Sequence, residues 1–283
     1  MMHNALIAFA LSLGIVSSTS CERRKGEKGR IAVAVTILPL ADFVENLGRD
    51  KVKVVVMVPP GASPHTYEPT PEQLRRVSEA EMYVKLGSGV EFELAWLDKL
   101  SKINRKMIIV DSSEGMELIG KNPHVWLSPK NAEKMVENIC DGLVRIDPGN
   151  REYYIGSKKK YIRKLEELDE YIREKLNGIE NRRFMVYHPA WDYLASDYGL
   201  EQIPIERAGK EPTALEIKKA VERAKKYGIK TIFVSPQFVA KGAQVIAEEI
   251  DGRIVFLDPL PRDYINDMRI VVERLARAMR GGI

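Results

Sequence analysis

The chain has 283 residues, of which 45% are hydrophobic and 30% are charged, with only four His and two Cys. This composition is that of an ordinary folded protein of about two modest domains, so it excludes a disordered chain and a disulfide-rich scaffold. The formal net charge is only +4, from 44 basic and 40 acidic residues interleaved along the polar segments, and this balance argues against a nucleic-acid-binding protein.

The N-terminal segment has the features of an export signal. An apolar run over residues 5–16 is too short to cross a bilayer and has the length of a signal-peptide core, so residues 1–20 are predicted to be a signal peptide. Cys21 is then a candidate lipid anchor, although an uncleaved anchor and a cleaved signal without lipid stay open. The polar residues 21–30 predict a tether. We therefore expect an extracytoplasmic protein, at the cell surface or in the periplasm.

Folded sequence begins at residue 31, where short β-branched runs alternate with longer amphipathic runs. The runs that predict strands are 31–37, 52–58, 82–86 and 107–110. The runs that predict helices are 39–47, 71–78, 92–100 and 131–144. Such alternation predicts a parallel sheet with covering helices, so residues 31–149 are expected to form an N-terminal α/β lobe. Within the last of these helices, Cys140 is predicted to be a buried apolar residue and not a metal ligand.

One long helix is predicted over residues 150–181, because apolar side chains recur there at helical spacing and form a single stripe. Its roughly thirty residues would extend about 45 Å. We expect it to join the first lobe to a second α/β lobe over residues 182–283. The runs of that lobe that predict strands are 184–187, 231–234 and 254–257, and those that predict helices are 213–227, 239–250 and 263–279.

Three of the four His adjoin a Pro, and the fourth, His3, lies in the predicted signal peptide. An adjacent Pro restricts the backbone, which suits an imidazole that must be held at a fixed angle. His65 and His188 follow predicted strands, and Asp258 follows the predicted strand 254–257. Ligands collect at the carboxyl ends of parallel strands.

The imidazoles of His65, His124 and His188 are candidates for a tetrahedral zinc shell, together with the carboxylate of Asp258. The four residues lie 59, 64 and 70 positions apart (65 to 124, 124 to 188 and 188 to 258). Only the fold could bring them together, with two ligands from each lobe. The metal site is therefore expected in the cleft between the lobes.

The chain resembles the metal-specific solute-binding proteins of ABC transporters, the zinc and manganese uptake receptors. Besides the long helix, the stretches that carry the resemblance are PPGASPHTYEPTP, NPHVWLSPKNA, YHPAWDYLASDYGL, EPTALEIKKAVERAKKYGIKTIFVSPQF and VFLDPL. The resemblance implies two α/β lobes, each a mainly parallel sheet with covering helices, joined by one rigid helix. It also implies metal ligands at His65, His124, His188 and Asp258.

The same resemblance implies a function. The protein would capture a divalent ion outside the membrane and deliver it to an ABC permease with its cytoplasmic ATPase. We expect a monomer that is associated with the membrane through its N-terminal lipid or anchor.

Two differences within the family bear on which ion is carried. The segment before His124, SSEGMELIGKNP, lacks the His-rich acidic loop of many zinc-specific members, which removes one zinc marker. Manganese-type members often have Glu at the position matching His188, where this chain has His. Imidazoles suit Zn²⁺, whereas Mn²⁺ prefers carboxylate and water. We therefore expect Zn²⁺ as the transported ligand, with Mn²⁺ or iron as the alternative.

Two functions of other classes stay open. A zinc hydrolase with a three-His site would need an open position for water and a general base, for which Glu68, Glu206 and Glu211 are candidates. The chain has no HExxH motif, and we expect that it is not an enzyme. An adhesin or interaction protein would bind its partner without the three His.

Several neighbours of the predicted ligands have two interpretations. Trp126 and Trp191 could form a wall of the metal site, although core packing is the expected role. Tyr187, Asp192 and Glu206 are candidates for orienting the imidazoles by hydrogen bonds.

Overall fold

The structure is a computed structural model that describes residues 29–206, 211–238 and 241–281. The predicted signal peptide 1–20, Cys21 and most of the predicted tether 21–30 lie outside the described residues. Among the helices that the structure describes, none is both long enough and apolar enough to cross a membrane.

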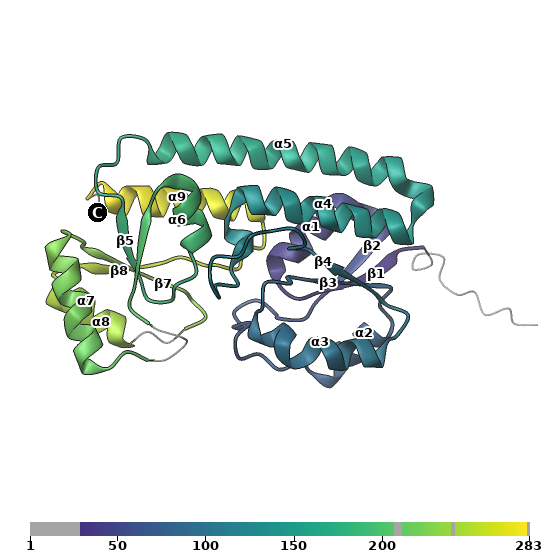
Figure 1. Cartoon of the computed structure of the whole chain (residues 1–283), viewed down its shortest axis with the longest axis horizontal. Coiled ribbons are helices and arrows are strands. Elements are labelled where there is room, and N and C mark those ends of the chain that lie inside the picture. The colour runs from purple at the N-terminus through teal and green to yellow at the C-terminus, as the bar shows by residue number, and fades with distance from the viewer. Residues whose placement is uncertain (1–28, 207–210, 239–240, 282–283) are drawn as a thin grey trace, which may run out of the picture.

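The first lobe is built on a four-stranded parallel sheet with the order β2-β1-β3-β4. Its strands are β1 (Ile31–Val35), β2 (Val52–Val56), β3 (Met82–Lys85) and β4 (Ile108–Asp111). Helices cover both faces of the sheet (Figure 1), which is why its central strands are almost continuously apolar. These helices are α1 (Leu38–Gly48), α2 (Pro71–Ser78), α3 (Glu91–Ile103) and α4 (Pro129–Ile146).

The second lobe repeats this architecture with a parallel sheet of order β6-β5-β7-β8. Its strands are β5 (Arg183–Val186), β6 (Glu201–Pro204), β7 (Thr231–Val234) and β8 (Arg253–Phe256). Its helices are α6 (Asp192–Tyr198), α7 (Ala214–Lys226), α8 (Lys241–Glu249) and α9 (Tyr264–Met279). The predicted fold class, two lobes with parallel sheets and covering helices, is thus confirmed.

Two elements of the second lobe were not predicted from the sequence. Helix α6 has only seven residues, too few for a helical period to show. Strand β6 has the sequence EQIP, which is poor in β-branched residues and ends on Pro204. A Pro is tolerated there because β6 is an edge strand of the sheet.

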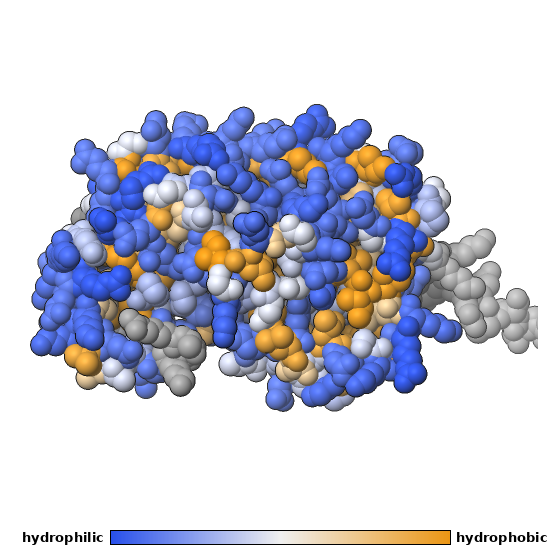
Figure 2. Space-filling view, viewed as in Figure 1, coloured by the Kyte–Doolittle hydropathy of each residue, from blue (hydrophilic) through white to orange (hydrophobic). Residues whose placement is uncertain are grey.

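The long helix α5 (Arg151–Leu176) extends over both lobes (Figure 1). Its buried residues, spaced as predicted, are Tyr154, Ser157, Tyr161, Leu165, Leu168, Ile172 and Leu176. Its outward side belongs to a mostly hydrophilic surface (Figure 2). The helix ends at Leu176 and not at residue 181, because Asn177 is extended and Gly178 has a φ of +70°, a conformation that Gly adopts at little cost.

Helices α5 and α9 pack against each other and join the lobes into one body. The start of α9 reaches the first lobe, where the ring of Tyr264 lies 5.0 Å from that of Phe43 on α1. Among the described residues, the larger of two buried cores runs from the first sheet through α5, α6 and α9 without a break. A smaller core lies between the second sheet and helices α7 and α8.

Because the larger core is shared, we predict that the two lobes unfold together. Leu168 on α5 is fully buried, so Leu168→Ala should lower the free energy of unfolding by about 2–5 kcal/mol. The exposed Glu170→Ala should change it by less than about 0.5 kcal/mol. Urea denaturation of the metal-free protein measures both, and two separate transitions in the unmodified chain would contradict the shared core.

Candidate metal centre

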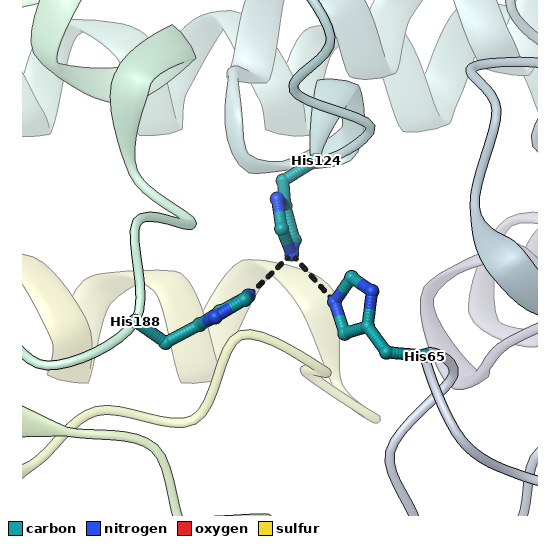
Figure 3. Close-up of side chains that lie close together, drawn as sticks. All are labelled: His65, His124 and His188. Atoms are coloured by element: carbon teal, nitrogen blue, oxygen red, sulfur yellow. Dashed lines mark hydrogen bonds between the residues drawn. The ribbon is translucent and has the colours of Figure 1, made fainter. Parts of the chain in front are cut away.

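Three His side chains from three loops converge between the lobes (Figure 3). His65 lies in the loop after β2, His124 comes directly before the short 3-10 helix Val125–Leu127, and His188 follows β5. The Nε2 atom of His124 lies 3.3 Å from Nε2 of His65 and 3.2 Å from Nε2 of His188. The fold thus brings together the three imidazoles that the sequence singled out.

Short turns hold these loops in place. The backbone N–H of His124 donates to Oδ1 of Asn122 at 3.0 Å, and that of His65 donates to Oγ of Ser63 at 3.3 Å. The carbonyl of His188 accepts from the N–H of Ala190 at 2.9 Å. Together with the adjacent Pro residues, these bonds fix the direction in which each imidazole leaves the backbone.

Each imidazole also forms a hydrogen bond with an oxygen through Nδ1, its outer nitrogen, which is the ring nitrogen that does not face the other imidazoles. The three pairs are His65 Nδ1 with Glu91 Oε2 at 2.5 Å, His124 Nδ1 with Asn122 Oδ1 at 2.5 Å, and His188 Nδ1 with Glu206 Oε1 at 3.3 Å. Because each oxygen is an acceptor, the proton of each neutral ring lies on Nδ1, and Nε2 keeps its lone pair.

Three inward lone pairs repel one another unless a cation lies among them. Ligands placed tetrahedrally at about 2.0 Å from an ion lie about 3.3 Å apart, and two of the Nε2 separations are 3.2 and 3.3 Å. The arrangement therefore has the geometry of a ligand set for one divalent ion.

Burial favours the neutral form that such binding needs. It lowers the pKa of His124 well below its ordinary value, and the neighbouring His188 and His65 lower that pKa further. Burial also lowers the pKa of His65, although the hydrogen bond with Glu91 opposes the shift. Neutral imidazoles hold free lone pairs, so these two candidate ligands stay available to a cation at lower pH than an ordinary His.

The imidazoles line a cavity of about 10 Å³ between the lobes. The other lining residues are Ser63, Pro64, Trp126, Gln237, Phe238, Pro259 and Leu260. The ring of Phe238 stacks on His188 with centroids 4.6 Å apart. A cavity of this size holds about one water molecule, so it suits a single ion.

The structure does not place Asp258 within the group of three imidazoles. As predicted, it follows β8, but its side chain is exposed, and its Oδ1 accepts from Nε2 of Gln237 at 2.7 Å and from the N–H of Leu260 at 2.9 Å. Both of these partners line the cavity. Asp258 therefore lies at the edge of the site, and its role as a fourth ligand stays a prediction.

The two Trp residues near the His differ in role. Trp126 is fully buried in the core, as expected, and it also lines the cavity, with its ring centroid 5.1 Å from that of His124. Trp191 belongs to the core and does not line this cavity. Cys140 is fully buried as predicted, and burial raises the pKa of its thiol.

Among the carboxylates proposed from the sequence, Glu206 is the one that contacts an imidazole of the site. Tyr187 does not orient an imidazole, since its hydroxyl donates to Oε2 of Glu211 at 2.6 Å. Glu68 is exposed. Asp192 acts on His124 through Asn122, because its Oδ2 accepts from Nδ2 of Asn122 at 2.7 Å.

Glu91 and Asn122 contact imidazoles of the site but were not predicted from the sequence. Asn122 had a local signal, because an Asn two residues before His124 can accept from its backbone N–H in a short turn. Glu91 had none, since it begins α3, 26 residues after His65, and only the packing of that helix brings the two together.

Comparison with known proteins gives a result that is consistent with a metal site formed by the three imidazoles. Residues 33–278 match the family described as zinc-uptake complex component A, periplasmic. The high-affinity zinc uptake system protein ZnuA of Bacillus subtilis (strain 168) is 30% identical over 279 residues, which cover 90% of this chain and 86% of that protein. A crystal structure of ZnuA is 38% identical and covers 88% of this chain and 99% of its own, with a TM-score of 0.85.

A third relative is a domain of a longer protein. The Zn(II)-bound ZnuA-like domain of Streptococcus pneumoniae AdcA is 28% identical, with a TM-score of 0.77, and the match covers 89% of this chain and 99% of that domain. The present chain spans 54% of the complete AdcA of that organism.

The lowered pKa values predict how the metal-free protein responds to acid. The folded-state pKa of His124 lies below the value of about 6.5 expected in the unfolded chain. The unfolded chain therefore takes up more protons as the pH falls through this window, and the free energy of unfolding decreases.

The measurement is urea denaturation with a chelator present, at about pH 7.5 and about pH 5.5, on either side of the ordinary His pKa. The unmodified protein should lose more stability between the two pH values than His124→Gln, which cannot titrate at this position. Equal losses would show that His124 is not held neutral by the fold.

Proposed function

The chain belongs to the family of periplasmic zinc-uptake components, and on this basis we propose that it captures a divalent metal ion, zinc, and delivers it to an ABC permease for import. The observation that carries the proposal is the convergence of three Nε2 atoms at a cavity of about 10 Å³. Such a cavity offers an ion nitrogen ligands and no space for a larger substrate.

We propose His65, His124 and His188 as ligands and Asp258 as the fourth. The position of Asp258 supports this, because it follows β8 and the next residue, Pro259, lines the cavity. Three neutral imidazoles and one carboxylate would leave the loaded site with a net charge of +1. A set rich in imidazole favours Zn²⁺ over Mn²⁺, which prefers oxygen ligands.

Binding without catalysis is part of the proposal. A zinc hydrolase keeps a coordination position open for water and holds a general base beside it. Here Phe238 stacks on His188, and the cavity has little room beyond the ion. The nearest candidate base, Glu206, contacts the outer nitrogen of His188 and so faces the far side of the ring.

To deliver the ion, the protein must lie outside the cytoplasm and must bind a partner in the membrane. The family is periplasmic, and we further propose that Cys21 carries a lipid that holds the protein at the membrane. The protein would act there as a monomer that docks on a permease driven by a cytoplasmic ATPase. Because the lobes share one core, we propose that the ion leaves through local movement around the cavity and not through wide opening of the lobes.

Removing any one imidazole should weaken zinc binding. Zinc affinity of His65→Ala, His124→Ala and His188→Ala should fall by more than about 100-fold, because loss of a ligand costs more than loss of a partner that orients one. Competition against a chelator of known affinity measures this, with zinc and manganese compared for each protein. Unchanged affinity in the three variants would contradict the site, and tighter binding of manganese than of zinc would contradict the choice of ion.

The oxygens that accept hydrogen bonds from the outer nitrogens of the imidazoles should also affect zinc affinity. Glu206→Gln keeps the shape of the side chain but removes the charge that favours a strongly basic His188, so zinc affinity should fall by about 10- to 100-fold. Glu211→Gln is the matched control, because Glu211 bonds Tyr187 and no imidazole of the site. If both variants bind zinc equally well, Glu206 does not support His188 in the way proposed.

A further inference from the structure

Gln237 connects the wall of the metal cavity to the carboxylate at its edge. Its side chain lines the cavity, and its Nε2 donates to Oδ1 of Asp258 at 2.7 Å. The other end of the same carboxamide, Oε1, is buried, and no residue in the described part of the chain donates to it. A reversed amide would place two acceptor oxygens together, so the bond with Asp258 sets the orientation of Gln237.

The backbone around Gln237 is held against the imidazoles. The chain turns directly after β7, where the N–H of Phe238 donates to the carbonyl of Ser235 at 3.2 Å. The ring of Phe238 then stacks on His188 at 4.6 Å. A group on this turn therefore has a defined position relative to the metal ligands.

One oxygen of Asp258 is consequently occupied. Oδ1 accepts two hydrogen bonds, from Gln237 and from the N–H of Leu260 at 2.9 Å. These two donors fix the carboxylate and leave Oδ2 as the oxygen with capacity for an ion. A carboxylate that offers one oxygen, with three imidazoles, makes a four-coordinate shell. Zinc favours such a shell, whereas Mn²⁺ favours more oxygen ligands.

We propose that Gln237 determines metal specificity by holding Oδ1 of Asp258, which limits the carboxylate to one-oxygen coordination and favours zinc over manganese. This inference rests on the proposed function and on Asp258 as the fourth ligand. Gln237 acts through Asp258, so it is a positioning residue and does not itself bind the ion.

The test replaces Gln237 with Met, which has a similar length and no donor. Competition titrations of the full chain with Zn²⁺ and Mn²⁺ should show that the ratio of zinc to manganese affinity falls by about tenfold or more, equivalent to about 1.4 kcal/mol. In the same variant loaded with Co²⁺, the intense visible absorption of a four-coordinate ion should weaken as the second oxygen joins the shell. Gln237→Glu, which replaces the donor with an acceptor, should shift the ratio in the same direction and serves if the Met variant fails to fold.

Two controls test whether Gln237 acts through Asp258. Gln244→Met breaks a similar bond, from Nε2 of Gln244 to Glu248 at 2.9 Å on α8, and should leave both readouts unchanged. In an Asp258→Ala background, adding Gln237→Met should cause no further change in the ratio, because the residue through which Gln237 acts is gone.

The outcomes separate this inference from the function on which it rests. A ratio within about twofold of the unmodified protein in Gln237→Met, with an unchanged Co²⁺ spectrum, would overturn the role of Gln237. A further shift in the Asp258→Ala background would overturn it as well. Failure of the unmodified chain to bind zinc would instead overturn the proposed function.

Discussion

Three hydrogen bonds from the Nδ1 atoms of the imidazoles orient the whole candidate metal centre. Each ring donates from Nδ1 to an oxygen, and this turns three Nε2 lone pairs toward one point. Without these acceptors each ring could carry its proton on either nitrogen, and an inward N–H would oppose a cation. The acceptors differ in exposure, since Glu206 is buried whereas the side chain of Glu91 is 58% exposed. The tautomer is therefore fixed both at the centre of the site and at its rim.

The orientation of the imidazoles is useful only if the two lobes keep their relative position. Trp126 of the first lobe donates from Nε1 to the carbonyl of Pro259 in the second lobe at 2.6 Å, and Tyr264 on α9 donates to the carbonyl of Trp126 at the same distance. Helix α5 and the shared core support these contacts over the length of the molecule. The lobes thus hold a small site between them, and Trp126 takes part both in the wall of the cavity and in the contact between lobes.

Much of the architecture could be predicted, because the pattern of each element is local. The apolar stripe from Tyr154 to Leu176 lies on one face of a helix whatever packs against it. The strand 231–234 was predicted with its observed bounds because it is short, apolar and buried on both faces. Helix α6 and strand β6 were missed, since their stability comes from neighbours and their own sequences carry little signal.

The features of the candidate metal centre can also be separated into those that a local sequence pattern indicates and those that depend on packing. The sequence by itself identified the three imidazoles as candidate ligands, because each His adjoins a Pro and two of them follow predicted strands, at whose carboxyl ends ligands collect in parallel α/β sheets. Only the tertiary structure decided how those rings are oriented and how Asp258 is held. Glu91 reaches His65 from 26 residues away, and Gln237 reaches Asp258 from 21 residues away. Such pairings depend on how separate elements pack, and no local pattern in the chain records that packing.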